Sequence, residues 1–145
     1  VTGTAEWMRE LLRKPYVIYN YMYSNGLRKT EISNMTGKSY VTKLRWPELE
    51  KDDTHQGKSI FKYQCMSCHT ENGYRGMKKL IGTRDQEAIA SFLKLMQEND
   101  PAKNPYSGLM PPFVGDDDDI KKLSAYLNTL NNEKTEKVKV LTIRQ

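Results

Sequence analysis

The two cysteines of this chain lie three positions apart and are followed at once by a histidine, in the run Cys65-Met66-Ser67-Cys68-His69. Two thiols at this spacing share one face of a helical turn, so both can add to the two vinyl groups along one edge of a porphyrin. The imidazole of His69 is then carried under the ring, where it can bind iron. C-x-x-C-H is the attachment signature of c-type haem. It predicts one haem c, bound covalently through Cys65 and Cys68, with His69 on the iron.

Three other kinds of site use cysteines at such a spacing. A thioredoxin-like redox pair needs a βαβ setting, whereas the flanking residues here have helical periodicity. A zinc site could recruit His55 as a fourth ligand, but the adjacency of Cys68 and His69 is awkward for tetrahedral closure. A disulfide across so short a loop is strained. Haem attachment is therefore the favoured interpretation, with the redox pair and the zinc site as alternatives.

A second iron ligand can be sought among the seven methionines and the other histidine. Met110 stands before two prolines in the run Gly108-Leu109-Met110-Pro111-Pro112-Phe113, and prolines stiffen the backbone and forbid a helix. A rigid loop can hold a thioether against iron, so Met110 is the predicted sixth ligand. Met77, in a segment of glycine and lysine, is the rival, and ligation by His55 is a further alternative.

Three stretches with helical periodicity surround these candidate ligands. Upstream, Gly57, Phe61 and Cys65 recur at a spacing of four. Residues 85–97 and residues 120–130 also place apolar side chains on one helical face. We therefore expect an all-α domain.

Four aspartates, at positions 116–119, stand directly before the last of these stretches. Carboxylates at a helix start accept hydrogen bonds from free N–H groups and complement the helix dipole. We therefore interpret the four as a helix cap, with a calcium site as the alternative.

The charge of the chain is spread along it rather than concentrated. The net charge of +5 divides into +1 for residues 57–131 and +2 for each flank. No basic stripe interleaved with aromatic residues stands out, so nucleic acid is not an expected partner. No apolar run approaches the roughly 20 residues that a membrane-spanning helix needs. Because the chain begins with Val1 rather than methionine, we expect a processed form or a piece of a longer protein.

Taken together, residues 50–132 resemble a class I c-type cytochrome of the small bacterial type. The haem motif and the methionine loop, which comprises residues 108–113, carry the resemblance. Gly57 and Phe61 match packing positions ahead of the motif, and Tyr126 and Leu127 match the C-terminal helix that crosses it. The resemblance implies a class I cytochrome c fold whose first and last helices cross near a right angle. The haem would then lie in an apolar crevice with one edge exposed.

The resemblance also implies further haem contacts. Arg75 or Tyr74 would bind a propionate, since a charge-assisted hydrogen bond there is favourable. Many relatives have a proline soon after the C-H pair, whereas residues 70–73 here are Thr-Glu-Asn-Gly. The usual backbone partner of the histidine is therefore not identified. Besides Phe61, the predicted pocket lining consists of Leu80, Ile81, Pro105, Tyr106, Leu109 and Phe113.

With His69 and Met110 both on iron, no coordination position is open to a substrate. The expected function is therefore single-electron transfer between redox protein partners, in a respiratory chain, rather than catalysis. A haem enzyme with an open iron site is an alternative. The resemblance implies a periplasmic or equivalent extracytoplasmic compartment, with the protein soluble or membrane-associated. Five lysines could steer an acidic partner: Lys58, Lys62, Lys78, Lys79 and Lys103.

Residues 1–49 form an N-terminal extension that is rich in tyrosine between positions 16 and 23. It could wrap over the haem domain, or it could be a docking segment for a membrane-bound partner, since such a composition suits a membrane interface. Residues 12–19 resemble part of subunit I of cytochrome bd-type quinol oxidases. The chain could thus be the soluble cytochrome c domain of a membrane-bound oxidoreductase. Residues 133–145 are predicted to be a tail, with a short strand over 137–144 as the alternative.

Overall fold

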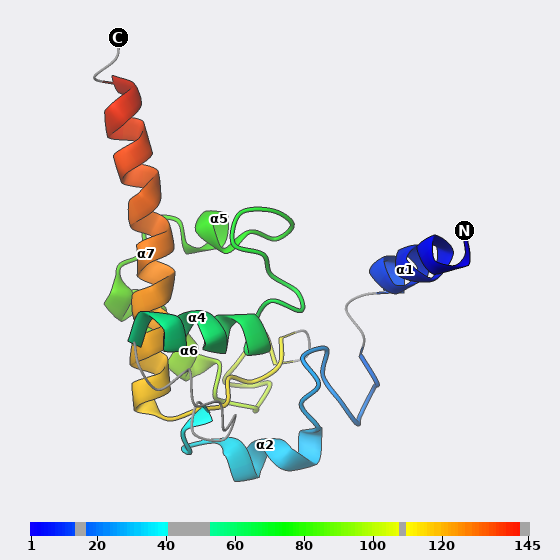
Figure 1. Cartoon of the computed structure of the whole chain (residues 1–145). Helices are drawn as coiled ribbons and strands as arrows, with labels where there is room; N and C mark the ends of the chain where they lie inside the picture. Colours follow the sequence, from blue (N-terminus) through cyan, green and yellow to red (C-terminus); the bar gives the residue numbers. More distant parts are fainter. Residues whose placement is uncertain (14–16, 41–52, 108–109, 143–145) are drawn as a thin grey trace.

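The computed structural model describes residues 1–13, 17–40, 53–107 and 110–142, except the side chains of residues 13, 53–55 and 132–142. Regular structure in these residues is helical, apart from isolated bridges that pair Ile18 with Met22 and Met22 with Arg28. This confirms the predicted all-α class. The helices, labelled in Figure 1, are α1 (Thr2–Arg13), α2 (Lys29–Met35), α4 (Asp53–Gln64), α5 (Met77–Ile81), α6 (Gln86–Leu95) and α7 (Asp117–Thr142).

The long helix α7 packs against α4, α5 and α6, and α4 lies across it (Figure 1). A glycine permits the close approach of α4 to α7. A Cβ atom at Gly57 would lie 2.8 Å from the Tyr126 Cβ and would also collide with the carbonyl oxygen of Lys122. One turn further on, the rings of Phe61 and Tyr126 pack with their centroids 5.9 Å apart. The contact between the first and last helices of the haem domain thus forms at the residues predicted for it.

The main hydrophobic core lies between these helices, and Phe113, at the end of the methionine loop, completes it. Helix α6 contributes the apolar face predicted for residues 85–97, although the helix itself ends at Leu95. Its start is capped by Asp85, whose carboxylate accepts a hydrogen bond of 2.8 Å from the Ala88 N–H. The buried members of the main core are Ile60, Phe61, Ile81, Ile89, Leu93, Met96, Phe113, Ile120, Leu123, Tyr126, Leu127 and Leu130.

Aspartates at the start of α7 cap the helix. The Asp119 N–H donates to the Asp116 Oδ1 at 2.8 Å, and the Asp116 N–H donates to the Asp119 Oδ2 at 3.2 Å. This reciprocal pair is a capping box in which two aspartates take the usual places of serine and glutamate. Among the described residues, no group of three or more histidine, cysteine, aspartate or glutamate side chains is arranged to hold a metal ion. The capping interpretation therefore accounts for Asp116 and Asp119 without calcium.

The end of α7 differs from the sequence-based expectation. The helix continues to Thr142, so the alternative of a short strand over 137–144 is wrong for the described residues 137–142. The alternation of apolar and charged residues there resembles a strand pattern over a short window. However, neither glycine nor proline interrupts residues 116–142, and an established helix extends by one hydrogen bond per added residue.

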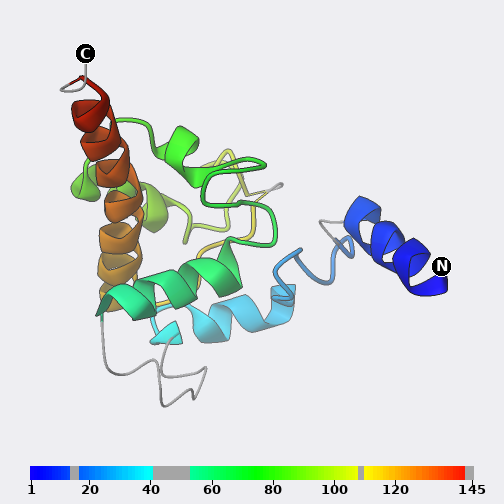
Figure 2. The ribbon, with the colours of Figure 1, turned by 45° about the horizontal axis from the view of Figure 1, so that its top comes forward.

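The N-terminal extension has two parts, of which only the second packs on the haem domain. The first part, α1, stands away from the rest of the molecule in both views (Figures 1 and 2). Its described side chains are all exposed, including the apolar ones at Trp7, Met8, Leu11 and Leu12. No helix among the described residues is both long enough and apolar enough to cross a membrane.

The second part of the extension packs on the haem domain. Tyr23, Leu27, Ile32 and Met35 form a buried cluster with Val114, which follows the methionine loop. Two further bonds join the same regions. The Tyr40 N–H donates to the Asp119 Oδ2 at 2.6 Å, and the Gly37 N–H donates to the Gly115 carbonyl at 3.1 Å. The described residues 23–40 thus wrap over the haem domain, while residues 41–49 of the extension lie outside the described part.

Candidate functional site

The C-x-x-C-H motif forms a helical turn that continues from the end of α4. The Cys65 N–H bonds to the Phe61 carbonyl at 2.9 Å, and the N–H groups of Cys68 and His69 bond to the Cys65 carbonyl at 3.1 and 2.9 Å. Both cysteines are free thiols and are partly buried. Cys65 also packs against the main core. The fold therefore presents two thiols and an imidazole from one short, well-bonded turn.

The ring of His69 is oriented by a backbone carbonyl. Its Nδ1 lies 3.1 Å from the carbonyl oxygen of Arg75. Because a carbonyl oxygen only accepts, Nδ1 carries the proton and Nε2 is the nitrogen that can bind a metal. Arg75 has a φ of 46°, a left-handed conformation that is uncommon for a residue other than glycine. This conformation belongs to the turn that brings the carbonyl to the ring.

Arg75 thus has a role that the sequence analysis missed. The propionate contact expected for its guanidinium or for Tyr74 stays a prediction, and the structure adds a backbone role, in which its carbonyl lies against His69. The guanidinium is exposed and lies over the ring of Tyr74, 5.4 Å from its centroid. Nothing in the sequence signals the contact to His69, because it depends on a backbone conformation rather than on the residue type.

The loop after His69 is fixed by side chains. The Thr70 hydroxyl donates to the Tyr74 carbonyl at 2.9 Å and accepts from the Gly73 N–H at 2.8 Å. The Tyr126 hydroxyl, on α7, donates to the Glu71 carboxylate at 2.7 Å. The backbone that carries the Arg75 carbonyl is therefore tied both to itself and to the long helix.

The methionine loop is organised by a buried asparagine that the sequence analysis did not single out. Asn104 is fully buried; its Oδ1 accepts from the Tyr106 N–H at 3.0 Å, and its Nδ2 donates to the Glu98 carbonyl at 2.9 Å. The Met110 N–H in turn donates to the Tyr106 carbonyl at 2.8 Å. Met110 itself is half-buried and packs against the main core.

The other predicted haem contacts fall into three groups. Phe61, Ile81 and Phe113 are buried in the main core. Leu80 and Tyr106 are 49% and 43% exposed, and Pro105 is exposed as well. Leu109 lies outside the described residues. The rival ligand Met77 is half-buried and packs against the same core as Met110, so the choice between the two methionines stays a prediction.

The donor set of this site fits a covalently bound haem. Two free thiols at the required spacing can form thioethers, and His69 offers its Nε2 to iron because its Nδ1–H is already bonded. The half-exposed apolar side chains of Leu80 and Tyr106 would gain from an apolar cover. The residues of the motif therefore suit the group that the sequence predicts.

The same thiols do not suit redox chemistry of the thioredoxin type. Burial raises the pKa of the Cys65 thiol to about 12, and the neighbouring Cys68 adds to the effect. Reactive C-x-x-C pairs have a lowered thiol pKa instead, because the thiolate is the nucleophile. The described residues also contain no βαβ unit. The side chain of His55, named for the zinc alternative, lies outside the described part.

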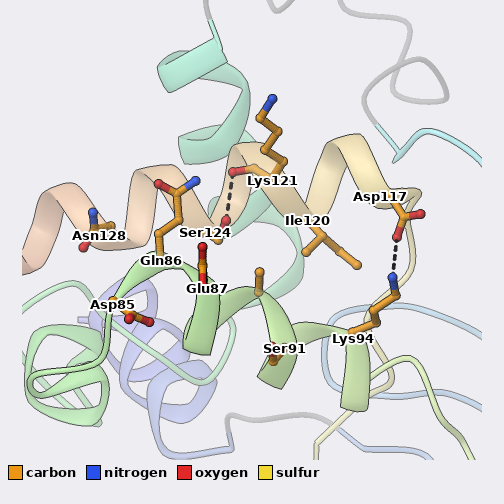
Figure 3. Close-up of a pocket in the computed structure, with 11 residues that line it drawn as sticks. Asp85, Gln86, Glu87, Ser91, Lys94, Asp117, Ile120, Lys121, Ser124 and Asn128 are labelled. Carbon is orange, nitrogen blue, oxygen red and sulfur yellow. Dashed lines mark hydrogen bonds and ion pairs between the residues drawn. The ribbon is translucent and has the colours of Figure 1, made fainter.

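An open groove of about 870 Å³ lies elsewhere, between α6 and the first half of α7 (Figure 3). It is lined by charges of both signs, and its Lys94 and Asp117 form an ion pair of 3.2 Å. None of the predicted site residues lines this groove. It is therefore separate from the C-x-x-C-H site.

A comparison with protein families confirms the resemblance inferred from the sequence. The family model described as Cytochrome c matches residues 54–131, which is more than half of the chain. The matched range begins in α4, includes Cys65, Cys68, His69 and Met110, and ends in α7. Neither the comparison with curated proteins nor the comparison with solved structures found a significant match.

Proposed function

Because this chain belongs to the cytochrome c family, we propose that it carries single electrons, with His69 and Met110 as the two side chains that would hold its haem iron. Haem-mediated electron transfer follows from the family, and Cys65 and Cys68 are the thiols that attach haem c. When bound, the haem supplies an iron that accepts and releases one electron. The observation that carries the proposal is the bond from the His69 Nδ1–H to the Arg75 carbonyl, which leaves Nε2 for the metal.

Each residue of the site then has a defined task. Cys65 and Cys68 anchor the cofactor to the turn after α4. The hydrogen bond from His69 makes its imidazole a stronger electron donor and fixes its orientation. A thioether from Met110 favours the reduced state and raises the potential relative to a second histidine. With both His69 and Met110 on the iron, no position would be left for a substrate, so the expected activity is electron transfer rather than catalysis.

The experiment that tests the ligand pair compares Met110→Leu with Met77→Leu in the haem-loaded protein. Both methionines are half-buried against the same core, so the two changes form a matched pair. We expect Met110→Leu to abolish the weak far-red band of sulfur bound to oxidised iron. It should also open the reduced iron to carbon monoxide, while Met77→Leu leaves both properties unchanged. The reverse result would make Met77 the ligand, and rapid carbon monoxide binding by the unaltered protein would favour a haem enzyme.

A second candidate function is that of an electron-entry domain for a membrane-bound oxidoreductase. The feature that favours it is α1, which exposes Trp7, Met8, Leu11 and Leu12 outside the folded unit. Arg9 is paired with Glu6 on the same helix, so the support comes from the exposed apolar side chains, and an exposed apolar patch marks a surface for a protein or membrane partner. In this candidate, α1 brings the haem domain to its redox partner. Both candidates place the protein in a periplasmic or equivalent extracytoplasmic compartment, where haem c is attached.

A further inference from the structure

The side chain of Gln64 makes a double hydrogen bond to a residue far away in the sequence. Its Nε2 donates to the Val114 carbonyl at 2.7 Å, and its Oε1 accepts from the Val114 N–H at 3.1 Å. Gln64 is 5% exposed and Val114 is fully buried. The amide therefore satisfies both backbone groups of Val114, using one donor and one acceptor of its own.

The two ends of this contact adjoin the two segments that carry the proposed iron ligands. Gln64 is the last residue of α4 and directly precedes Cys65. Val114 follows Met110 after Pro111, Pro112 and Phe113. The two prolines restrict the intervening backbone, so we expect part of a displacement at Val114 to reach Met110, although the Phe113 N–H is bonded separately to the Met96 carbonyl at 2.9 Å.

We propose that Gln64 is a positioning residue that holds Met110 against the haem iron, by fixing the methionine loop to the turn that carries Cys65 and His69. The inference rests on the proposed function, since it requires Met110 as a ligand. The physical reason is that loss of the Gln64 amide leaves the buried N–H and carbonyl of Val114 without these partners. The loop then relaxes away from the turn, and the thioether spends more time off the iron.

The chain offers a matched control for this role. The Nε2 of Gln97, which follows α6, donates to the Gly115 carbonyl at 3.0 Å. This bond anchors the residue next to Val114, but it runs toward α6 rather than to the haem-bearing turn. A change at Gln97 should therefore weaken the fold without separating the two ligand segments.

The experiment measures Gln64→Leu and Gln97→Leu in the full haem-loaded chain. For Gln64→Leu we expect carbon monoxide to bind the reduced protein about tenfold faster. This corresponds to a decrease of about 1.4 kcal/mol in the free energy needed to move Met110 off the iron. We also expect a weaker far-red sulfur band and a lower midpoint potential. Gln97→Leu should keep all three properties, while both variants unfold at lower denaturant concentration. Gln64→Met, which keeps the length of the side chain and loses both the donor and the acceptor, is judged by the same criteria if the leucine variant does not fold.

The outcomes separate this inference from the function on which it rests. If Gln64→Leu is destabilised but keeps the carbon monoxide kinetics and the potential of the unaltered protein, Gln64 only holds the fold together and the inference is overturned. The ligand pair would then still stand. If the unaltered protein binds carbon monoxide as fast as Met110→Leu, Met110 is not a ligand, and both proposals are wrong.

Discussion

The hydrogen bond from the His69 Nδ1–H to the Arg75 carbonyl joins the imidazole of the attachment motif to the loop that follows it. The role of His69 follows from its place directly after Cys68, because the chemistry of haem attachment needs these residue types in contiguous order. The role of Arg75 follows from a φ of 46° that turns its carbonyl toward the imidazole. A non-glycine residue in this region is uncommon and is often retained where a site needs it.

Arg75→Pro separates the backbone role of this residue from its charge. Proline fixes φ near −65°, so it cannot adopt the observed conformation, and the bond to His69 should be lost. A less electron-rich imidazole stabilises the oxidised iron less, so we expect the midpoint potential to rise by on the order of 60 mV, tenfold in a one-electron equilibrium. Arg75→Gly, which tolerates a positive φ, should leave the potential near its original value. Redox titration of the three proteins measures the difference.

The sign of the shift is decisive in this comparison. If the guanidinium served the haem, as the sequence analysis expected, its removal in either variant would take away a positive charge and lower the potential. A fall for both Arg75→Gly and Arg75→Pro would therefore support the propionate role of the guanidinium. It would contradict the prediction that Arg75 influences the midpoint potential through its carbonyl.

Buried polar side chains were the least predictable residues of the site. Asn104 and Gln64 both bond to backbone groups, and Gln64 reaches a partner fifty positions away. A helical or strand periodicity carries no information about such pairs, because they depend on which loops the fold brings together. The attachment motif could be predicted because its partners are adjacent in the chain, whereas these residues could be assigned only from the fold.

At the level of the elements, the apolar spacing predicted the helices of the haem domain better than it predicted their ends. Residues 120–130 were expected to be helical, and they are, but α7 continues to Thr142. The reason is physical: hydrophobic spacing reports the part of a helix that contacts the core, and the last α7 residue in the described core is Leu130. The short helix α5 was not predicted, since five residues are too few to show a period.

Gly57→Ala tests the contact on which the fold of the haem domain depends. An added methyl group would meet the Tyr126 Cβ at 2.8 Å and would also collide with the Lys122 carbonyl, so α4 and α7 must move apart. We expect the free energy of unfolding to fall by about 1–3 kcal/mol, as for other overpacked cores. Gly3→Ala is the control, because a Cβ there has no neighbour within 4 Å. Denaturant unfolding measures both, and equal stability of Gly57→Ala and the unaltered protein would show that the crossing is looser than described.

For the molecule as a whole, composition suggested an N-terminal extension but not how it is divided. Residues 23–40 pack on the haem domain, whereas a docking role for α1 stays a proposal. Residues 23–40 contribute Tyr23, Leu27, Ile32 and Met35 to a buried cluster around Val114, whereas none of the described side chains of α1 is buried. The sequence alone could not draw this boundary, because both parts are rich in apolar and aromatic residues. Only packing distinguishes an apolar side chain that a fold buries from one that it leaves to a partner.

This division predicts effects of different size on the free energy of unfolding for two changes in the extension. Ile32 is 4% exposed, so Ile32→Ala should lower the free energy of unfolding by about 2–5 kcal/mol through lost burial and a cavity. Leu12 is 81% exposed, so Leu12→Glu should change the same quantity by no more than about 0.5 kcal/mol.

If α1 docks at a membrane, however, Leu12→Glu should slow reduction of the haem by membrane preparations. Reduction by a small soluble reductant should be unaffected, and visible absorbance follows both reactions. Equal rates for Leu12→Glu and the unaltered protein would remove the support for a membrane-bound partner, and an unchanged stability of Ile32→Ala would show that residues 23–40 are not part of the folded unit.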